Sequence, residues 1–182
     1  MPNDPLGVAL LTIARNAIEK AFGHAQRTIV PHPDLALSAA SFVTLTQAGQ
    51  LRGCIGSLEA HRPLAQDVAE NAVAAAFRDP RFSPLVEAEL GDTRIEVSLL
   101  EAAEPLTFED EANALTQLRP GLDGVILTHG NRRATFLPQV WESLPDPQQF
   151  ISHLKLKAGL PAYFWDDGIT LARYGVQKWK ES

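Results

Sequence analysis

Apolar residues recur at helical spacing in several stretches of the chain. The first stretch covers residues 5–22, where Asp4 and Pro5 provide an N-cap and a first-turn proline, and Gly23 suits the helix end. Because its apolar residues fall on one side, we expect a helix over 5–22 that packs on a sheet. Further helices are expected to begin at Pro63, Thr107 and Asp146.

The helical stretch after Pro63 must end before Pro80, because proline cannot continue a helix. Its apolar residues share one stripe, while Asp67 and Glu70 fall on the opposite side and are expected to face solvent. Arg81 lies just past the helix end. It is the best candidate in this turn for binding an anion, although satisfying terminal carbonyl groups is the simpler role for an arginine here.

Strict alternation of apolar and polar residues marks Thr93–Leu100 as the clearest strand, with Arg94, Glu96 and Ser98 on its polar side. Other strands are expected over residues 38–47, 51–58, 125–128, 133–137 and 169–176. Short glycine-containing turns join the first two and the next two of these, which predicts two hairpins.

The stretch LRGCIGS at residues 51–57 holds the only cysteine of the chain, beside an arginine and between two glycines. In a regular strand, Leu51 and Ile55 share one face and are expected to meet the core. Arg52 and Cys54 would then share the other face, where the fixed cation would favour a thiolate if both groups were partly exposed. If Thr93–Leu100 lies in the same sheet, Glu96 is expected to continue this polar face and neutralise an arginine.

Two readings of this stretch compete. Glycine weakens a strand and is found where a bulge, a bend or a close ligand requires the missing side chain, so Gly53 and Gly56 could form a pocket floor. A lone cysteine, however, commonly behaves as a small buried apolar residue without any chemistry. The glycines could equally serve strand packing.

Composition excludes several classes of function. The chain has 182 residues, 45% of them hydrophobic, which is enough for one well-buried core, and its formal charge of -6 opposes non-specific nucleic-acid binding. One cysteine permits no internal disulfide and favours a reducing cytoplasm. We expect no membrane span, and the five histidines lack metal-ligand spacing, so neither a metal nor a cofactor is expected.

Several motifs in order resemble those of the AMMECR domain family, which includes the AmmeMemoRadiSam system protein A type. The likeness covers residues 38–160. The motifs that carry it are LRGCIGS, AAAFRDPRFSPL, EVSLL, the glycine-containing run at 121–126, RRATFLPQVW and FISHLKLKAGL.

The resemblance implies a single α+β domain over residues 1–182, with an antiparallel or mixed sheet of about five or six strands and packed helices. The family has no established activity. Its members are often associated with Memo-like and radical S-adenosylmethionine (radical SAM) proteins, which implies a shared modification pathway. Many members carry a second cysteine where this chain has Lys155, and this departure weakens any dithiol mechanism.

Three hypotheses follow for the LRGCIG stretch. In the first, Cys54 acts chemically on a small ligand. In the second, the stretch binds a ligand or protein substrate without turnover, and in the third it has an architectural role within an adaptor module. Whether the protein is an enzyme is left open. Cys54 is the catalytic candidate. The candidate ligand-binding residues are Arg52, Gly53, Gly56, Ser57, Arg81 and Glu96.

Overall fold

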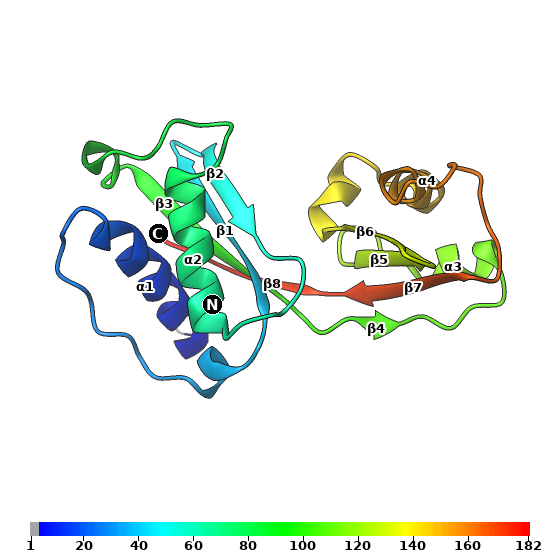
Figure 1. The fold of residues 1–182 in the computed structure, drawn as a ribbon, viewed down its shortest axis with the longest axis horizontal. Coiled ribbons are helices and arrows are strands. Elements are labelled where there is room, and N and C mark those ends of the chain that lie inside the picture. The colour runs from blue at the N-terminus through cyan, green and yellow to red at the C-terminus, as the bar shows by residue number, and fades with distance from the viewer. Residues whose placement is uncertain (1–3) are drawn as a thin grey trace. The chain divides into compact units, whose positions relative to one another are not determined.

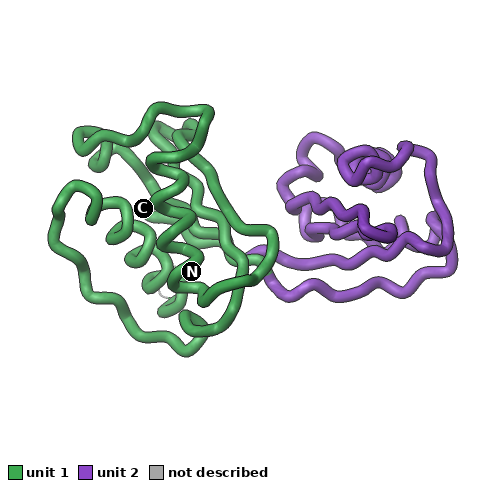
Figure 2. Tube along the Cα trace, viewed as in Figure 1, with its two compact units in different colours: residues 1–100, 177–182 green, residues 101–176 purple. Residues whose placement is uncertain are grey.

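A computed structural model describes residues 4–182 of the chain and divides it into two compact units (Figure 2). The first unit runs to Leu100 and includes Gln177–Ser182, and the second is Glu101–Val176. The expectation of one domain over the whole chain stays a prediction. Each unit has its own hydrophobic core, and each is described by itself below.

The sheet of the first unit has the strand order β2-β1-β3-β8. The pairs of β1 with β2 and of β1 with β3 are antiparallel, and the tight turn at Ala48 and Gly49 joins β1 to β2 with positive φ angles of 48° and 77°. The four strands are β1 (Ala40–Gln47), β2 (Gln50–Gly56), β3 (Thr93–Leu100) and β8 (Val176–Lys180).

Helices α1 (Pro5–Lys20) and α2 (Leu64–Phe77) lie side by side over one face of this sheet (Figure 1). Their leucine, valine and alanine residues pack against the inward residues of β1 and β3 to form a single core. The side chain of Asp4 accepts a hydrogen bond from the backbone N–H of Leu6 at 3.1 Å, which confirms the predicted N-cap. Two 3₁₀ turns complete the unit, η1 (Pro33–Ala36) and η2 (Glu87–Glu89).

The sheet of the second unit has the order β4-β7-β5-β6, and its pairs are antiparallel. Its core centres on Phe150, which stacks on Trp141 with ring centroids 3.8 Å apart. The elements are β4 (Glu104–Pro105), α3 (Glu111–Gln117), β5 (Gly124–His129), β6 (Arg132–Phe136), η3 (Pro138–Glu142), α4 (Pro147–Lys157) and β7 (Ile169–Tyr174).

The α+β class and the antiparallel arrangement are confirmed, and the strands form two sheets of four. The strand expected at Thr93–Leu100 has those same bounds, and the first helix ends two residues earlier than expected. Within residues 4–182, no helix combines the length and the apolar composition that crossing a membrane requires.

Candidate functional site

Strand β2 carries the LRGCIG residues at an edge of the first sheet, and its pairing with β1 contains a bulge. Gly53 lies opposite Leu45 and Leu51 lies opposite Thr46, so Arg52 is the extra residue. The bulge breaks the alternation of side chains, and Leu51 is 44% exposed. The prediction that Leu51 meets the core is therefore wrong, and Arg52 occupies the bulge itself, two residues before Cys54.

Both glycines of the motif are tightly packed. A Cβ atom on Gly53 would lie 2.2 Å from the carbonyl oxygen of Ala75 in α2, and one on Gly56 would lie 2.2 Å from the Phe42 ring. The backbone of β2 therefore approaches α2 more closely than a side chain would allow. The space left by the two missing side chains is filled by this unit's own atoms, and a role of these glycines in ligand binding stays a prediction.

Cys54 is half-buried, and its Sγ lies 3.2 Å from the hydroxyl oxygen of Thr44 on the neighbouring strand. On the outer edge of β2, its N–H donates to Asp79 Oδ2 at 2.9 Å and its carbonyl oxygen accepts from Arg81 Nη2 at 3.4 Å. Two backbone groups of this edge strand are thus bound by one acidic and one basic side chain.

Asp79 and Arg81 form an ion pair with 2.7 Å between Oδ2 and Nη2, and Asp79 is buried. The hydrogen bond from the Arg81 side chain holds the pKa of Asp79 well below its usual range, against the opposing effect of burial, and the N–H of Cys54 lowers it further. Asp79 therefore stays ionised and fixes the orientation of the Arg81 guanidinium group.

Arg52 is held in the same way by Glu89. Arg52 Nε lies 2.9 Å from Glu89 Oε1, and Nη2 lies 3.1 Å from Oε2 and 2.9 Å from the carbonyl oxygen of Ser83. The hydrogen bond from Arg52 lowers the pKa of Glu89 from 4.5 to about 2. Arg52 Nη1 is buried and has no hydrogen-bond partner among the described residues.

A groove with a volume of about 490 Å³ lies where these two ion pairs meet. The guanidinium carbons of Arg52 and Arg81 lie 5.9 Å and 5.5 Å from the centroid of the Phe82 ring, so both cations contact one aromatic residue. Cys54 is absent from the lining. We call this the arginine groove, and its lining residues are Arg52, Arg81, Phe82, Ser83, Pro84, Val86 and Glu89.

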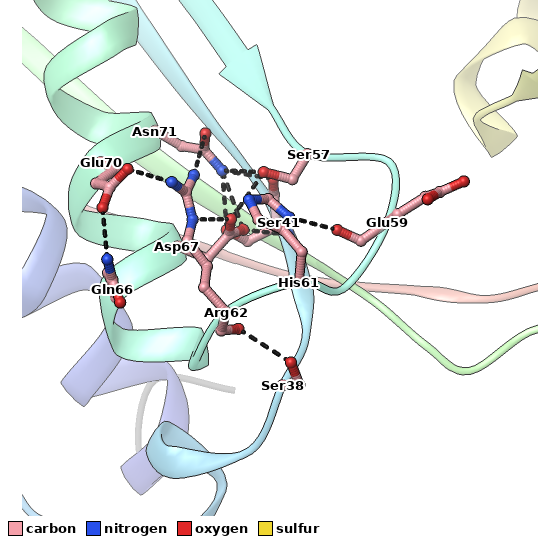
Figure 3. A network of polar contacts seen from close by, with 10 residues as sticks. All are labelled: Ser38, Ser41, Ser57, Glu59, His61, Arg62, Gln66, Asp67, Glu70 and Asn71. Atoms are coloured by element: carbon pink, nitrogen blue, oxygen red, sulfur yellow. Dashed lines mark hydrogen bonds and ion pairs between the residues drawn. The ribbon is translucent and has the colours of Figure 1, made fainter.

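Ser57 belongs to a separate polar network around Asp67, at the start of α2 (Figure 3). Asp67 is fully buried, and its carboxylate accepts from Ser57 Oγ at 2.7 Å and from Arg62 Nε at 2.7 Å. Ser41 donates to it through both N–H and Oγ, and Asn71 through Nδ2. The prediction that Asp67 faces solvent is therefore wrong, because the first turn of α2 meets strand ends whose polar groups need an acceptor.

Glu96 lies in register with Thr44, which in turn lies opposite Cys54, so the three residues form one row across β3, β1 and β2. This register places Glu96 on the face that Cys54 occupies. Its ion-pair partner is Lys178 Nζ at 3.9 Å, and the expected pairing of Glu96 with an arginine is not seen among the described residues.

In the second unit, Lys155 is fully buried, and its Nζ lies 2.5 Å from Glu111 Oε1 and 3.3 Å from the carbonyl oxygen of Ala162. It serves there as a paired cation within the core of that unit. Across residues 4–182, no group of three or more histidine, cysteine or acidic side chains is arranged to hold a metal ion.

The fold and these ion pairs define an α+β protein in which the arginine groove lies near a cysteine that is flanked by two glycines. The AMMECR1 family model matches residues 11–179, and the chain belongs to this family.

Relatives of similar length support the family assignment. A protein of Methanothermobacter thermautotrophicus is 38% identical over 96% of this chain and 94% of its own length, and one of Thermotoga maritima is 37% identical over 83% of each. The crystal structure of uncharacterized protein PH0010 from Pyrococcus horikoshii matches with a TM-score of 0.80, at 29% identity, over 99% of this chain and 93% of that one.

The ion pair of Glu89 predicts a pH dependence. Because folding lowers the pKa of Glu89 from 4.5 to about 2, its stabilising contribution is complete above pH 4.5 and is lost as the pH falls through about 2. We expect the difference in unfolding free energy between the wild type and Glu89→Gln, measured by urea denaturation, to shrink steadily over that interval. The exposed Glu109→Gln is the control, and a difference that is independent of pH would contradict the role of this pair.

Proposed function

We propose that this protein binds a ligand or protein substrate at the arginine groove, in the cytoplasm, within a modification pathway shared with Memo-like and radical SAM proteins. The observation that carries the proposal is the pair of guanidinium groups, each fixed by its own carboxylate, beside Phe82. Groups held in this way are preorganised, so a ligand that meets them loses less conformational entropy on binding. The pathway itself is proposed from the family resemblance.

Binding without turnover fits the surroundings of Cys54 better than nucleophilic catalysis. A nearby histidine is the usual base that activates a catalytic cysteine, and the hydrogen-bond neighbours of Cys54 are Thr44, Asp79 and Arg81. None of these is a histidine, and Asp79 is bonded to the backbone N–H and not to the sulfur. The sulfur therefore has no general base positioned against it within the described residues.

An architectural role for the LRGCIG stretch, within a non-catalytic adaptor, is the second candidate. The close approach of Gly53 to Ala75 and of Gly56 to Phe42 favours it, because both glycines then serve packing. In this case the binding surface is the groove alone, and the motif acts by holding β2 against α2 so that Arg52 and Cys54 keep their positions.

The proposal is tested with the Memo-like and radical SAM proteins of the same organism, purified and titrated by calorimetry. Val86 is 56% exposed in the groove, and Val30 is 45% exposed and outside the groove lining. We expect Val86→Lys to weaken binding by about tenfold or more, as removal of an interface anchor does, and Val30→Lys to leave it unchanged.

Cys54→Ser separates the candidates further. If the groove binds without chemistry, this variant keeps the wild-type affinity, because Cys54 does not line the groove. Equal affinities of Val86→Lys and Val30→Lys for both partners would contradict the proposal.

A further inference from the structure

Each arginine of the groove is held along one edge of its guanidinium group and is left unbonded at the other end. Arg52 uses Nε and Nη2 for Glu89, and Arg81 uses Nε and Nη2 for Asp79. Within the part of the chain that the structure describes, Nη1 of either arginine makes no hydrogen bond. Arg81 Nη1 can therefore donate to a new partner without breaking the ion pair with Asp79, whereas Arg52 Nη1 is enclosed by the protein's own atoms.

The two guanidinium groups lie near the same aromatic ring. Both guanidinium carbons are within 6 Å of the same Phe82 ring centroid, and both residues line the arginine groove. Arg81 has 55% of its side chain exposed, whereas Arg52 has 13% exposed. Arg81 thus offers an accessible donor group, and Arg52 adds a second positive charge at the same aromatic ring, an arrangement that suits an oxyanion entering from solvent.

The charges already present around the groove favour a singly charged anion over a doubly charged one. The two arginines already share the groove region with the carboxylates of Glu89 and Asp79, so these four groups sum to zero. A doubly charged phosphate would bring two negative charges next to those carboxylates, whereas a carboxylate brings one. The planar guanidinium ends also match the geometry of a carboxylate.

The other lining residues indicate which class of molecule would present a carboxylate to the groove. Phe82, Pro84 and Val86 give the groove an apolar side, and Val86 is 56% exposed. Pro84 and Ser83 are exposed as well, so the groove is open and a small molecule would remain largely in water. Enclosed pockets suit small ligands, while an extended peptide gains contact area along an open groove.

We infer that the arginine groove binds an acidic segment of a protein, with a glutamate or aspartate carboxylate at the free end of Arg81, near the positive charge of Arg52, and a neighbouring apolar side chain against Phe82, Pro84 and Val86. This inference rests on the proposed function and specifies its ligand.

The test uses the ¹⁵N-labelled full chain titrated with the blocked tripeptide acetyl-Leu-Glu-Leu-amide, its glutamine counterpart, sodium acetate and inorganic phosphate. The signals followed are the Nε–H groups of Arg52 and Arg81 and the backbone amide of Phe82. We expect the glutamate tripeptide to shift all three, with a dissociation constant in the range of about 1–10 mM that so few contacts allow. The glutamine tripeptide should bind about tenfold more weakly, since it lacks the charge.

Variants at Arg81 complete the design. Arg81→Lys keeps a positive charge beside Asp79 but lacks the second guanidinium nitrogen, so we expect about tenfold weaker binding of the glutamate tripeptide in a folded protein. Arg94→Gln, on an exposed arginine outside the groove, should bind as the wild type does. Equal binding of the glutamate and glutamine tripeptides, or no shift at all with the glutamate tripeptide, would overturn the inference.

Two further outcomes separate the inference from the function on which it rests. Tighter binding of phosphate than of the glutamate tripeptide would also overturn it and identify a phosphate site. If Val86→Lys weakens partner binding while the two tripeptides bind alike, the proposed function stands and only the carboxylate specificity fails.

Discussion

Replacing Gly53 with alanine is expected to lower the free energy of unfolding by about 3 kcal/mol, at the upper end of the cost of overpacking a core. The added Cβ would lie 2.2 Å from the carbonyl oxygen of Ala75. That oxygen belongs to the backbone of α2, next to the buried Ala76, so it cannot swing aside as a flexible side chain would. Urea denaturation measures the loss.

Gly91→Ala is the matched control for this substitution, because a Cβ at Gly91 would have no neighbour within 4 Å. We expect its unfolding free energy to stay within about 0.5 kcal/mol of the wild type. If Gly53→Ala were equally neutral, β2 and α2 would have to be separated by more than the structure places between them.

Removing the carboxylate of Asp67 has the second large expected effect. Asp67→Ala should lower the free energy of unfolding by about 3–5 kcal/mol, because it leaves the partly buried Arg62 and the donors of Ser41 and Asn71 without their acceptor. Asp67→Asn keeps one acceptor oxygen and should lose less.

The exposed Asp92→Ala serves as the control for the Asp67 variants, and it should change stability by less than about 0.5 kcal/mol. Thermal or urea unfolding of the three variants under the same conditions gives the comparison. Similar stabilities of Asp67→Ala and Asp92→Ala would show that the network in Figure 3 contributes little to folding.

The elements of the fold could be predicted because their signals are local. The alternation in Thr93–Leu100 depends only on adjacent residues, and the Asp146-Pro147 start of α4 depends on one turn of chain. Asp146 does accept from the N–H of Gln149 at 3.1 Å, as its capping role requires. Such patterns depend on residues close together in the sequence and not on tertiary contacts, so they can be recognised from the sequence alone.

The partners within the site could not be predicted in the same way. Arg52 and Glu89 are 37 residues apart, and no periodicity links them. The two-residue spacing of Asp79 and Arg81 across Pro80 was a usable signal for their pairing, but it did not show that both would reach the backbone of Cys54. These contacts depend on how the turn after α2 returns along β2.

Two errors share a physical cause. The helical pattern around Asp67 predicts a side chain in solvent, and a regular alternation along β2 predicts Leu51 in the core, because each pattern reflects its own element alone. The first turn of α2 meets strand ends, and the bulge at Arg52 shifts the face of Leu51. In both cases a neighbouring element decides the environment of the residue, and that information lies elsewhere in the chain.

The hydrogen bonds of Asp79 and Arg81 with the backbone of Cys54 also limit how other chains can bind to this protein. An uncovered edge strand can recruit a foreign strand, which leads to β-augmentation or to aggregation. The N–H of Cys54 is hydrogen-bonded to Asp79, and its carbonyl oxygen is hydrogen-bonded to Arg81. The backbone groups of Cys54 are therefore not free to pair with a strand of another chain. A partner that binds β2 at Cys54 must therefore recognise side chains. For the same reason, this edge of the sheet is protected at Cys54 from pairing with another copy of the chain.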